Sequence, residues 1–204
     1  MTGLVHHLRA RRVPAAMMGA AALVWGLWAI WTAISPPDTL PAPLAMAAIG
    51  FAAVAAGTTL TGADPDLDRT AALPWPTRRA LHLALAALVI LGLLLSVAGT
   101  AHGYGEPVAL VRNCAGALGL ISLGAATLGG ARSWFYLVPF ITIPPFLPIS
   151  RTTGDGVLGQ ILGWPVQAAE STAAGTTAAV LLALGAAGYI RRGSRSATSA
   201  RAAA

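Results

Sequence analysis

The sequence predicts an all-α polytopic membrane protein with six transmembrane helices and both termini in the cytoplasm. The first observation is composition: of 204 residues, 56% are hydrophobic and only 10% are charged, whereas soluble domains carry about 25% charged residues. The second is the spacing of the charges, which leaves six long uncharged stretches. The third is the placement of the arginines, which gather at alternate ends of these stretches.

The uncharged stretches have the length that a membrane helix needs. They contain between 18 and 26 residues, and about 20 apolar residues cross the hydrocarbon core. They form one transmembrane domain, 14–190, between a basic N-terminal segment, 1–13, and a basic tail, 191–204. We expect its helices at 14–34, 42–61, 80–100, 108–129, 133–149 and 170–190.

All thirteen basic side chains are arginines, and their placement predicts the orientation. Most lie in the N-terminal segment, in the loop 62–79, at Arg132 and in the tail. Because basic residues favour the cytoplasm, these places are expected inside, which also explains the net charge of +6 without nucleic acid. Exclusive use of arginine, with abundant alanine and glycine, indicates a GC-rich genome. We therefore expect a multi-pass protein of a bacterial plasma membrane.

Two segments depart from regular transmembrane helices. The stretch 133–149 contains four prolines, and each removes an amide donor and disturbs a helix. We expect a kinked or broken helix inside the bundle, because freed carbonyls in a membrane need protein or water partners. The outer segment 150–169 is moderately apolar but too short to span, and is expected to be a re-entrant or outer-leaflet helix.

Small residues recur at four-residue spacing, which favours close approach of neighbouring helices. The predicted packing positions are Ser171, Gly175, Ala179, Ala183 and Ala187 in the last helix, Ala53 and Gly57 in the second, and Ala115 and Gly119 in the fourth.

Three tryptophans, Trp25, Trp28 and Trp31, lie in the outer half of the first helix, roughly on one face. Tryptophan prefers the membrane interface, so one interpretation is an outer aromatic anchor. The other is a stacking site for an aromatic ligand.

Arg112 is the most costly residue in the sequence, because an arginine at a helix centre in lipid is penalised by at least ~2.5 kcal/mol. It lies early in the fourth predicted helix, beside Asn113. It either reaches the outer surface, pairs with Glu106 or Glu170, or lines a translocation path together with Asn113. Structural and functional roles are both open.

Catalytic motifs are sparse. The chain has no P-loop lysine, so any ATP and Mg²⁺ must be bound by another protein. Four histidines, at positions 6, 7, 82 and 102, show no metal-ligand spacing, and Cys114 is expected to be a buried thiol. We expect no cofactor and no metal in this chain, and no enzymatic activity of its own.

An acidic cluster at Asp64, Asp66 and Asp68 allows a different interpretation. Alternating carboxylates can bind Mg²⁺, although a solvated turn before a helix, with Asp66 or Asp68 as a cap, is the simpler explanation. The alternative function is therefore a membrane enzyme that acts on a lipid-linked substrate. A small channel or structural membrane protein is a third possibility.

The loop before the third helix carries Leu73-Pro74 and then Thr77-Arg78-Arg79. This pattern resembles the first cytoplasmic loop of permease subunits of type-2 ABC exporters, although Trp75-Pro76 departs from it. The resemblance implies that these five residues dock onto cytoplasmic ABC ATPase subunits. It also implies a second permease chain, like or unlike this one, and export of a hydrophobic, peptide or drug-like substrate through the lipid membrane.

The orientation yields a direct test. Reporter tags fused to the two ends of the chain are expected on the same, cytoplasmic side, because both ends are rich in arginine. Protease or fluorescence accessibility of the tags in membrane vesicles measures this. Tags on opposite sides would contradict the six-helix topology.

Overall fold

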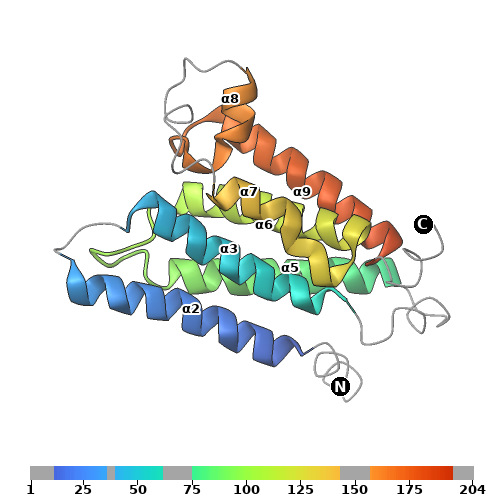
Figure 1. Ribbon diagram of the computed structural model, residues 1–204, viewed down its shortest axis with the longest axis horizontal. Coiled ribbons are helices and arrows are strands. Elements are labelled where there is room, and N and C mark those ends of the chain that lie inside the picture. Colours follow the sequence, from blue (N-terminus) through green and yellow to red (C-terminus); the bar gives the residue numbers. More distant parts are fainter. Residues whose placement is uncertain (1–11, 36–39, 62–74, 143–156, 195–204) are drawn as a thin grey trace.

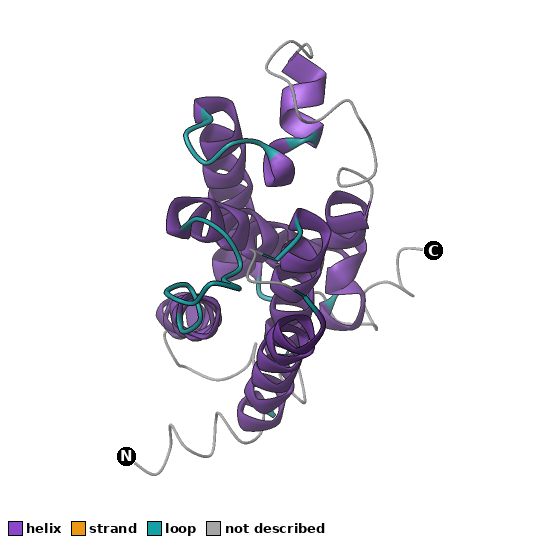
Figure 2. Ribbon diagram, turned by 90° about the vertical axis from the view of Figure 1, so that its left-hand side faces the viewer, coloured by secondary structure: helices purple, strands orange, loops and turns teal. Residues whose placement is uncertain are grey.

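Five long helices form the body of the protein. The computed structural model describes residues 12–35, 40–61, 75–142 and 157–194, and this part contains helices but no strand (Figures 1 and 2). Each long helix is apolar and long enough to cross a membrane. The all-helical class is thus confirmed, and a membrane-embedded protein is indicated. The five helices are α2 (Val13–Ile34), α3 (Ala42–Thr59), α5 (Trp75–Leu95), α6 (Pro107–Leu128) and α9 (Thr172–Arg192).

The predicted fifth span, 133–149, is not a long helix in its described part. It belongs to the 3₁₀ helix η1 (Gly130–Tyr136) and to the six-residue α7 (Leu137–Thr142). Pro139 lies within α7, where it lacks an amide hydrogen. The prediction of a broken helix is confirmed for these residues, whereas six membrane-crossing helices are not found among the described residues.

The third helix also differs from its predicted range. It was expected at 80–100 but runs over Trp75–Leu95, so the last five residues of the expected loop 62–79 are helical. Pro76 is compatible with this start, because the first amides of a helix have no acceptor within it. The other four long helices agree with their predicted ranges to within two residues.

Contacts between helix ends fix the directions of the helices. Trp25 and Trp28 in α2 donate to Ser96 and Thr100 just beyond α5, at 3.1 and 3.3 Å. Because the two contacts follow the same order along both segments, α2 and α5 run in the same direction. Thr59 at the end of α3 lies 2.9 Å from His82 near the start of α5. These two helices are therefore antiparallel, and Figure 1 shows α2 and α3 crossing the bundle in opposite directions.

The two ends of the bundle differ in charge. Both described chain ends, Arg12 and Ser194, lie at the end where α5 begins and α9 finishes (Figure 1). We call this the basic end, because it carries Arg12, Arg78, Arg79, Arg132, Arg191 and Arg192. At the opposite end lie Arg112 and, among the described residues, both glutamates, Glu106 and Glu170. The arginines at alternate ends of the uncharged stretches thus gather at one end of the bundle, as the sequence predicts.

Helix α6 is the centre of the bundle. Its residues Ala117, Ile121 and Ala125 are fully buried. It packs closely against α9, where a Cβ atom at Gly185 would overlap the carbonyl of Gly119. Because any side chain at these two positions would separate the helices, the contact depends on glycine on both sides.

The spacing of small residues predicted only some of the positions at which helices pack closely. Gly119 in α6 and Gly57 in α3 lie in close helix contacts, as expected. In α9, however, Ala179, Ala183 and Ala187 are exposed. The buried face of α9 is instead formed by Ala174, Ala178, Gly185 and Tyr189. The four-residue repeat was wrong for α9, because the buried face places Gly185 between two repeat positions.

Glycine contacts in α9 allow a matched test. Gly185→Ala is expected to lower the free energy of unfolding by about 1–3 kcal/mol, because the added methyl group overpacks the contact with Gly119. Gly175→Ala in the same helix meets no atom within 4 Å and is expected to be neutral or stabilising by up to ~1 kcal/mol. Thermal unfolding in detergent, followed by circular dichroism, measures both. Equal effects of the two variants would contradict the assigned α6–α9 contact.

Candidate functional site: a cavity opposite the basic end

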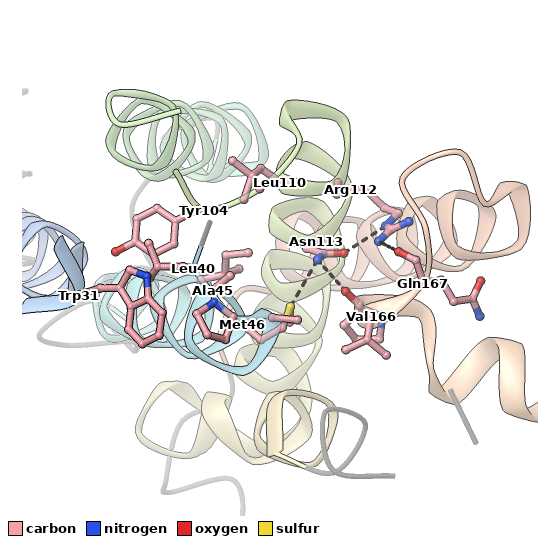
Figure 3. Close-up of a pocket in the computed structure, with 16 residues that line it drawn as sticks. Trp31, Leu40, Ala45, Met46, Tyr104, Leu110, Arg112, Asn113, Val166 and Gln167 are labelled. Carbon is pink, nitrogen blue, oxygen red and sulfur yellow. Dashed lines mark hydrogen bonds between the residues drawn. The ribbon is translucent and has the colours of Figure 1, made fainter. Parts of the chain in front are cut away.

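A cavity of about 620 Å³ lies at the end of the bundle opposite the basic end. Its walls come from the end of α2, the start of α3, the start of α6 and the segment before α9 (Figure 3). Much of the lining is apolar, with Leu40, Ala45, Met46, Ile49 and Leu110. Two parts of the lining carry polar side chains that are important below: Trp31 on one side, and Arg112 with Asn113 on the other.

The two residues predicted for a translocation path, Arg112 and Asn113, both line this cavity. Arg112 is only 7% exposed. Its Nη1 donates to the carbonyl of Ala168 at 2.7 Å and its Nη2 to the carbonyl of Gln167 at 2.9 Å. Its Nε donates to Asn113 Oδ1 at 3.1 Å. Backbone oxygens thus stabilise the largely buried guanidinium through hydrogen bonds.

The expected pairing of Arg112 with Glu106 or Glu170 is not present. Both carboxylates lie in the described part of the chain, both are exposed, and neither forms an ion pair with Arg112. Neutral carbonyl groups stabilise the cation through hydrogen bonds but leave its net charge in place. The cavity is therefore electropositive at this side.

Asn113 connects Arg112 to two further elements. Its Nδ2 donates to the carbonyl of Pro165 at 2.8 Å and lies 3.3 Å from Met46 Sδ in α3. Because its Oδ1 accepts from Arg112, the amide has one consistent orientation. Asn113 therefore holds α3, α6 and the segment before α9 together at one point.

The segment before α9 is held against α6 by packing as well. It contains α8 (Val157–Leu162) and η4 (Trp164–Val166), which are the described helices of the predicted outer segment 150–169. Trp164 is completely buried, and a Cβ atom at Gly116 in α6 would overlap its ring. Gly116 thus makes room for an indole that places the Gln167 carbonyl beside Arg112.

The three tryptophans of α2 have two different roles. Trp25 and Trp28 donate to Ser96 and Thr100, at 3.1 and 3.3 Å, and connect α2 to the residues after α5. Trp31 lines the cavity, and its buried indole Nε1 has no hydrogen-bond partner among the residues that the structure describes. The anchor interpretation thus fits the first two, whereas the position of Trp31 fits a ligand contact.

Tyr104 lines the cavity and connects the segment before α6 to α2. It is 3% exposed, and its hydroxyl donates to the backbone carbonyl of Val24. Burial raises the pKa of Tyr104 to about 12, so its phenol stays protonated at physiological pH. Sequence reasoning missed Tyr104, as it missed Met46 and Gln167, because nothing in their local pattern distinguishes them from ordinary loop or core residues.

The residues predicted to couple to a partner lie at the other end. Thr77 and Arg78 are exposed at the start of α5. Arg79 donates to the carbonyl of Ile190 at 3.3 Å in the last turn of α9, and its guanidinium lies 6.0 Å from the ring centroid of Trp75. Arg79 thus caps α9 of the same chain. Leu73 and Pro74 lie outside the described residues.

The other candidates supply no site in the described part of the chain. Asp64, Asp66 and Asp68, with His6 and His7, lie outside it. Cys114 is buried, as expected. His82 lies beside Thr59 in a helix contact, and no group of metal-binding side chains is found among the described residues.

Comparison with protein-family models, with curated proteins and with solved structures finds no match for this chain.

Tyr104 makes the stability of the folded protein depend on pH. Its pKa is about 12 in the folded protein and about 10 when unfolded. The buried, protonated phenol makes its full contribution to the free energy of unfolding below pH 10. This contribution is lost as the pH rises through 12, because the unfolded chain releases the phenol proton at a lower pH than the folded protein does. Tyr104→Phe is expected to cost about 1 kcal/mol at neutral pH through the lost hydrogen bond.

The same variant isolates the pH effect. Between pH 10 and 12, the unfolding temperature of the wild type is expected to fall more steeply than that of Tyr104→Phe. Scanning fluorimetry in detergent over this range measures both curves. Parallel curves would contradict the buried position of the phenol.

Proposed function

We propose that this protein is the transmembrane permease subunit of an ABC-type exporter in a bacterial plasma membrane. The basic end faces the cytoplasm in this proposal, and the cavity lies toward the outer side. Separate ATPase subunits hydrolyse ATP, and a second permease chain completes the transport unit. The observation that carries the proposal is the cavity itself, in which a buried arginine faces an apolar lining.

The chemistry of the cavity supports binding of a transported substrate. Ligand sites are typically concave, largely apolar and furnished with a few fixed polar groups. An ionisable residue within a membrane bundle is costly and marks substrate or ion pathways. Arg112 and Asn113 are held in fixed orientations by carbonyls of the segment before α9, which suits recognition better than a mobile surface arginine would.

The basic end supports docking of a partner through the start of α5. Arg78 is exposed there, whereas its neighbour Arg79 bonds to the end of α9. Helix α9 in turn packs on α6 through Gly185 and Gly119, and α6 carries Arg112. A continuous set of contacts therefore leads from the proposed docking site to the cavity. This continuity is compatible with ATP-driven motion that reshapes the cavity.

The proposal is tested by co-purification from native membranes in mild detergent, with mass spectrometry to identify bound ATPase subunits. In this proposal, Arg78 faces acidic groups of the ATPase. Arg78→Glu is therefore expected to lower the amount of ATPase recovered at least about tenfold, because like charges across an interface cost several kcal/mol. Arg132→Glu is the matched control, since Arg132 is exposed at the same end in a different turn.

Two outcomes would contradict these expectations. Recovery of the wild-type chain without any ATPase counts against the exporter assignment. Equal losses with Arg78→Glu and Arg132→Glu count against a specific role for the start of α5.

A further inference from the structure

We propose that the cavity binds an acylated anion, that is, a molecule with a phosphate or carboxylate head, an acyl carbonyl group and an apolar chain. The proposal deepens the transport role by naming the class of ligand. Its meaning as a transported substrate depends on that role, whereas binding itself requires no ATPase partner.

The anionic head follows from Arg112. The Arg112 residue is only 7% exposed, and the three hydrogen bonds that it makes within the described part of the chain go to neutral oxygens. Arginine has five N–H donors, so it has donors beyond these three bonds. A buried cation without a countercharge is strongly unfavourable, and no carboxylate in the described segments pairs with it. A ligand anion would supply the charge and accept the remaining donors.

The carbonyl group follows from Trp31. Its Nε1 is a buried donor that has no acceptor in the described structure, and a buried donor without an acceptor is costly. The neighbouring tryptophans of α2, Trp25 and Trp28, both have hydroxyl acceptors. The buried Nε1 of Trp164 also has no acceptor among the described residues, but Trp164 does not line the cavity, whereas Trp31 does. Trp31 lines the cavity on the side away from Arg112 (Figure 3), so a separate acceptor group of the ligand is required.

The apolar chain follows from the lining between these two donors. Figure 3 shows Ala45 and Met46 between Trp31 and Asn113, and Leu40, Ile49 and Leu110 complete this lining. The volume of about 620 Å³ lies within the range of about 300–1,000 Å³ that small-molecule sites occupy. One end of the site thus favours an anion, the other a neutral acceptor, and the space between them favours hydrocarbon.

The test uses three related lipids and the full-length protein in dodecyl maltoside micelles, because this detergent has neither a phosphate nor an acyl ester that would compete for the site. The probe is oleoyl lysophosphatidic acid, which has a phosphate and an acyl ester. Its ether-linked analogue lacks the ester carbonyl, and monooleoylglycerol lacks the phosphate. Binding of each radiolabelled lipid is measured by competition with the unlabelled probe.

The wild type is expected to bind the ether analogue about 3- to 10-fold more weakly than the probe, as for the loss of one hydrogen bond. It is expected to bind monooleoylglycerol more than about tenfold more weakly, because bonds to charged groups are stronger.

Variants assign each preference to its residue. Trp31→Phe keeps an aromatic ring but removes the donor, so it is expected to bind the ester and the ether equally. Trp28→Phe is the matched control and is expected to keep the preference for the ester. Arg112→Gln is expected to lose the preference for phosphate. If Arg112→Gln does not fold, the comparison of the three lipids on the wild type and on Trp31→Phe decides the outcome.

Equal binding of all three lipids by the wild type would overturn the proposal. An ester preference that persists in Trp31→Phe would overturn the assignment of the acceptor site. The transport role fails separately, if no ATPase accompanies the wild-type chain, and that result leaves lipid binding intact.

Discussion

A buried cation organises the end of the bundle that contains the cavity. Arg112 is largely buried and has no carboxylate partner in the described part of the chain, so groups of the chain itself stabilise its charge. Carbonyls that precede α9 accept its hydrogen bonds, and the burial of Trp164 against Gly116 holds the same segment on α6. These contacts connect the segment before α9 and one wall of the cavity to the charge of Arg112.

Close helix packing connects the end that contains Arg112 to the basic end. Gly119 and Gly185 bring α6 and α9 into backbone contact, and the last turn of α9 accepts a hydrogen bond from Arg79. Interiors packed in this way transmit strain rather than absorb it. The two ends of the protein are thus connected through few intermediate elements, although one carries exposed arginines and the other a cavity.

Properties that depend on long-range composition could be predicted from the sequence. Uncharged length placed four of the five long helices to within two residues, and arginine clusters indicated which helix ends lie together. The predicted start of the third helix was wrong, because Arg78 and Arg79 were taken as the limit of a loop although the helix begins at Trp75. A charge marks the membrane boundary rather than the end of a helix.

The cavity could be predicted only where a residue was anomalous in its own segment. Arg112 was such a residue, since an arginine in an apolar helix calls for an explanation. Trp31 was recognised as one of three similar tryptophans, and only the arrangement of Ser96 and Thr100 separates it from the other two. The repeat in α9 was misleading, because abundant alanine produces regular spacing on exposed faces as readily as on buried ones.

Helix α2 has an unusual position in this arrangement. Only Ala20 and Val24 are buried along its 22 residues, and two tryptophan hydrogen bonds connect it to the turn after α5. Its last turns nevertheless provide Trp31 to the cavity wall. The tilt of a helix in a bilayer is set by its packing against neighbouring helices and by interfacial anchors. The position of the cavity wall that carries Trp31 therefore depends on the packing of α2 against α3 and on the hydrogen bonds of Val24, Trp25 and Trp28.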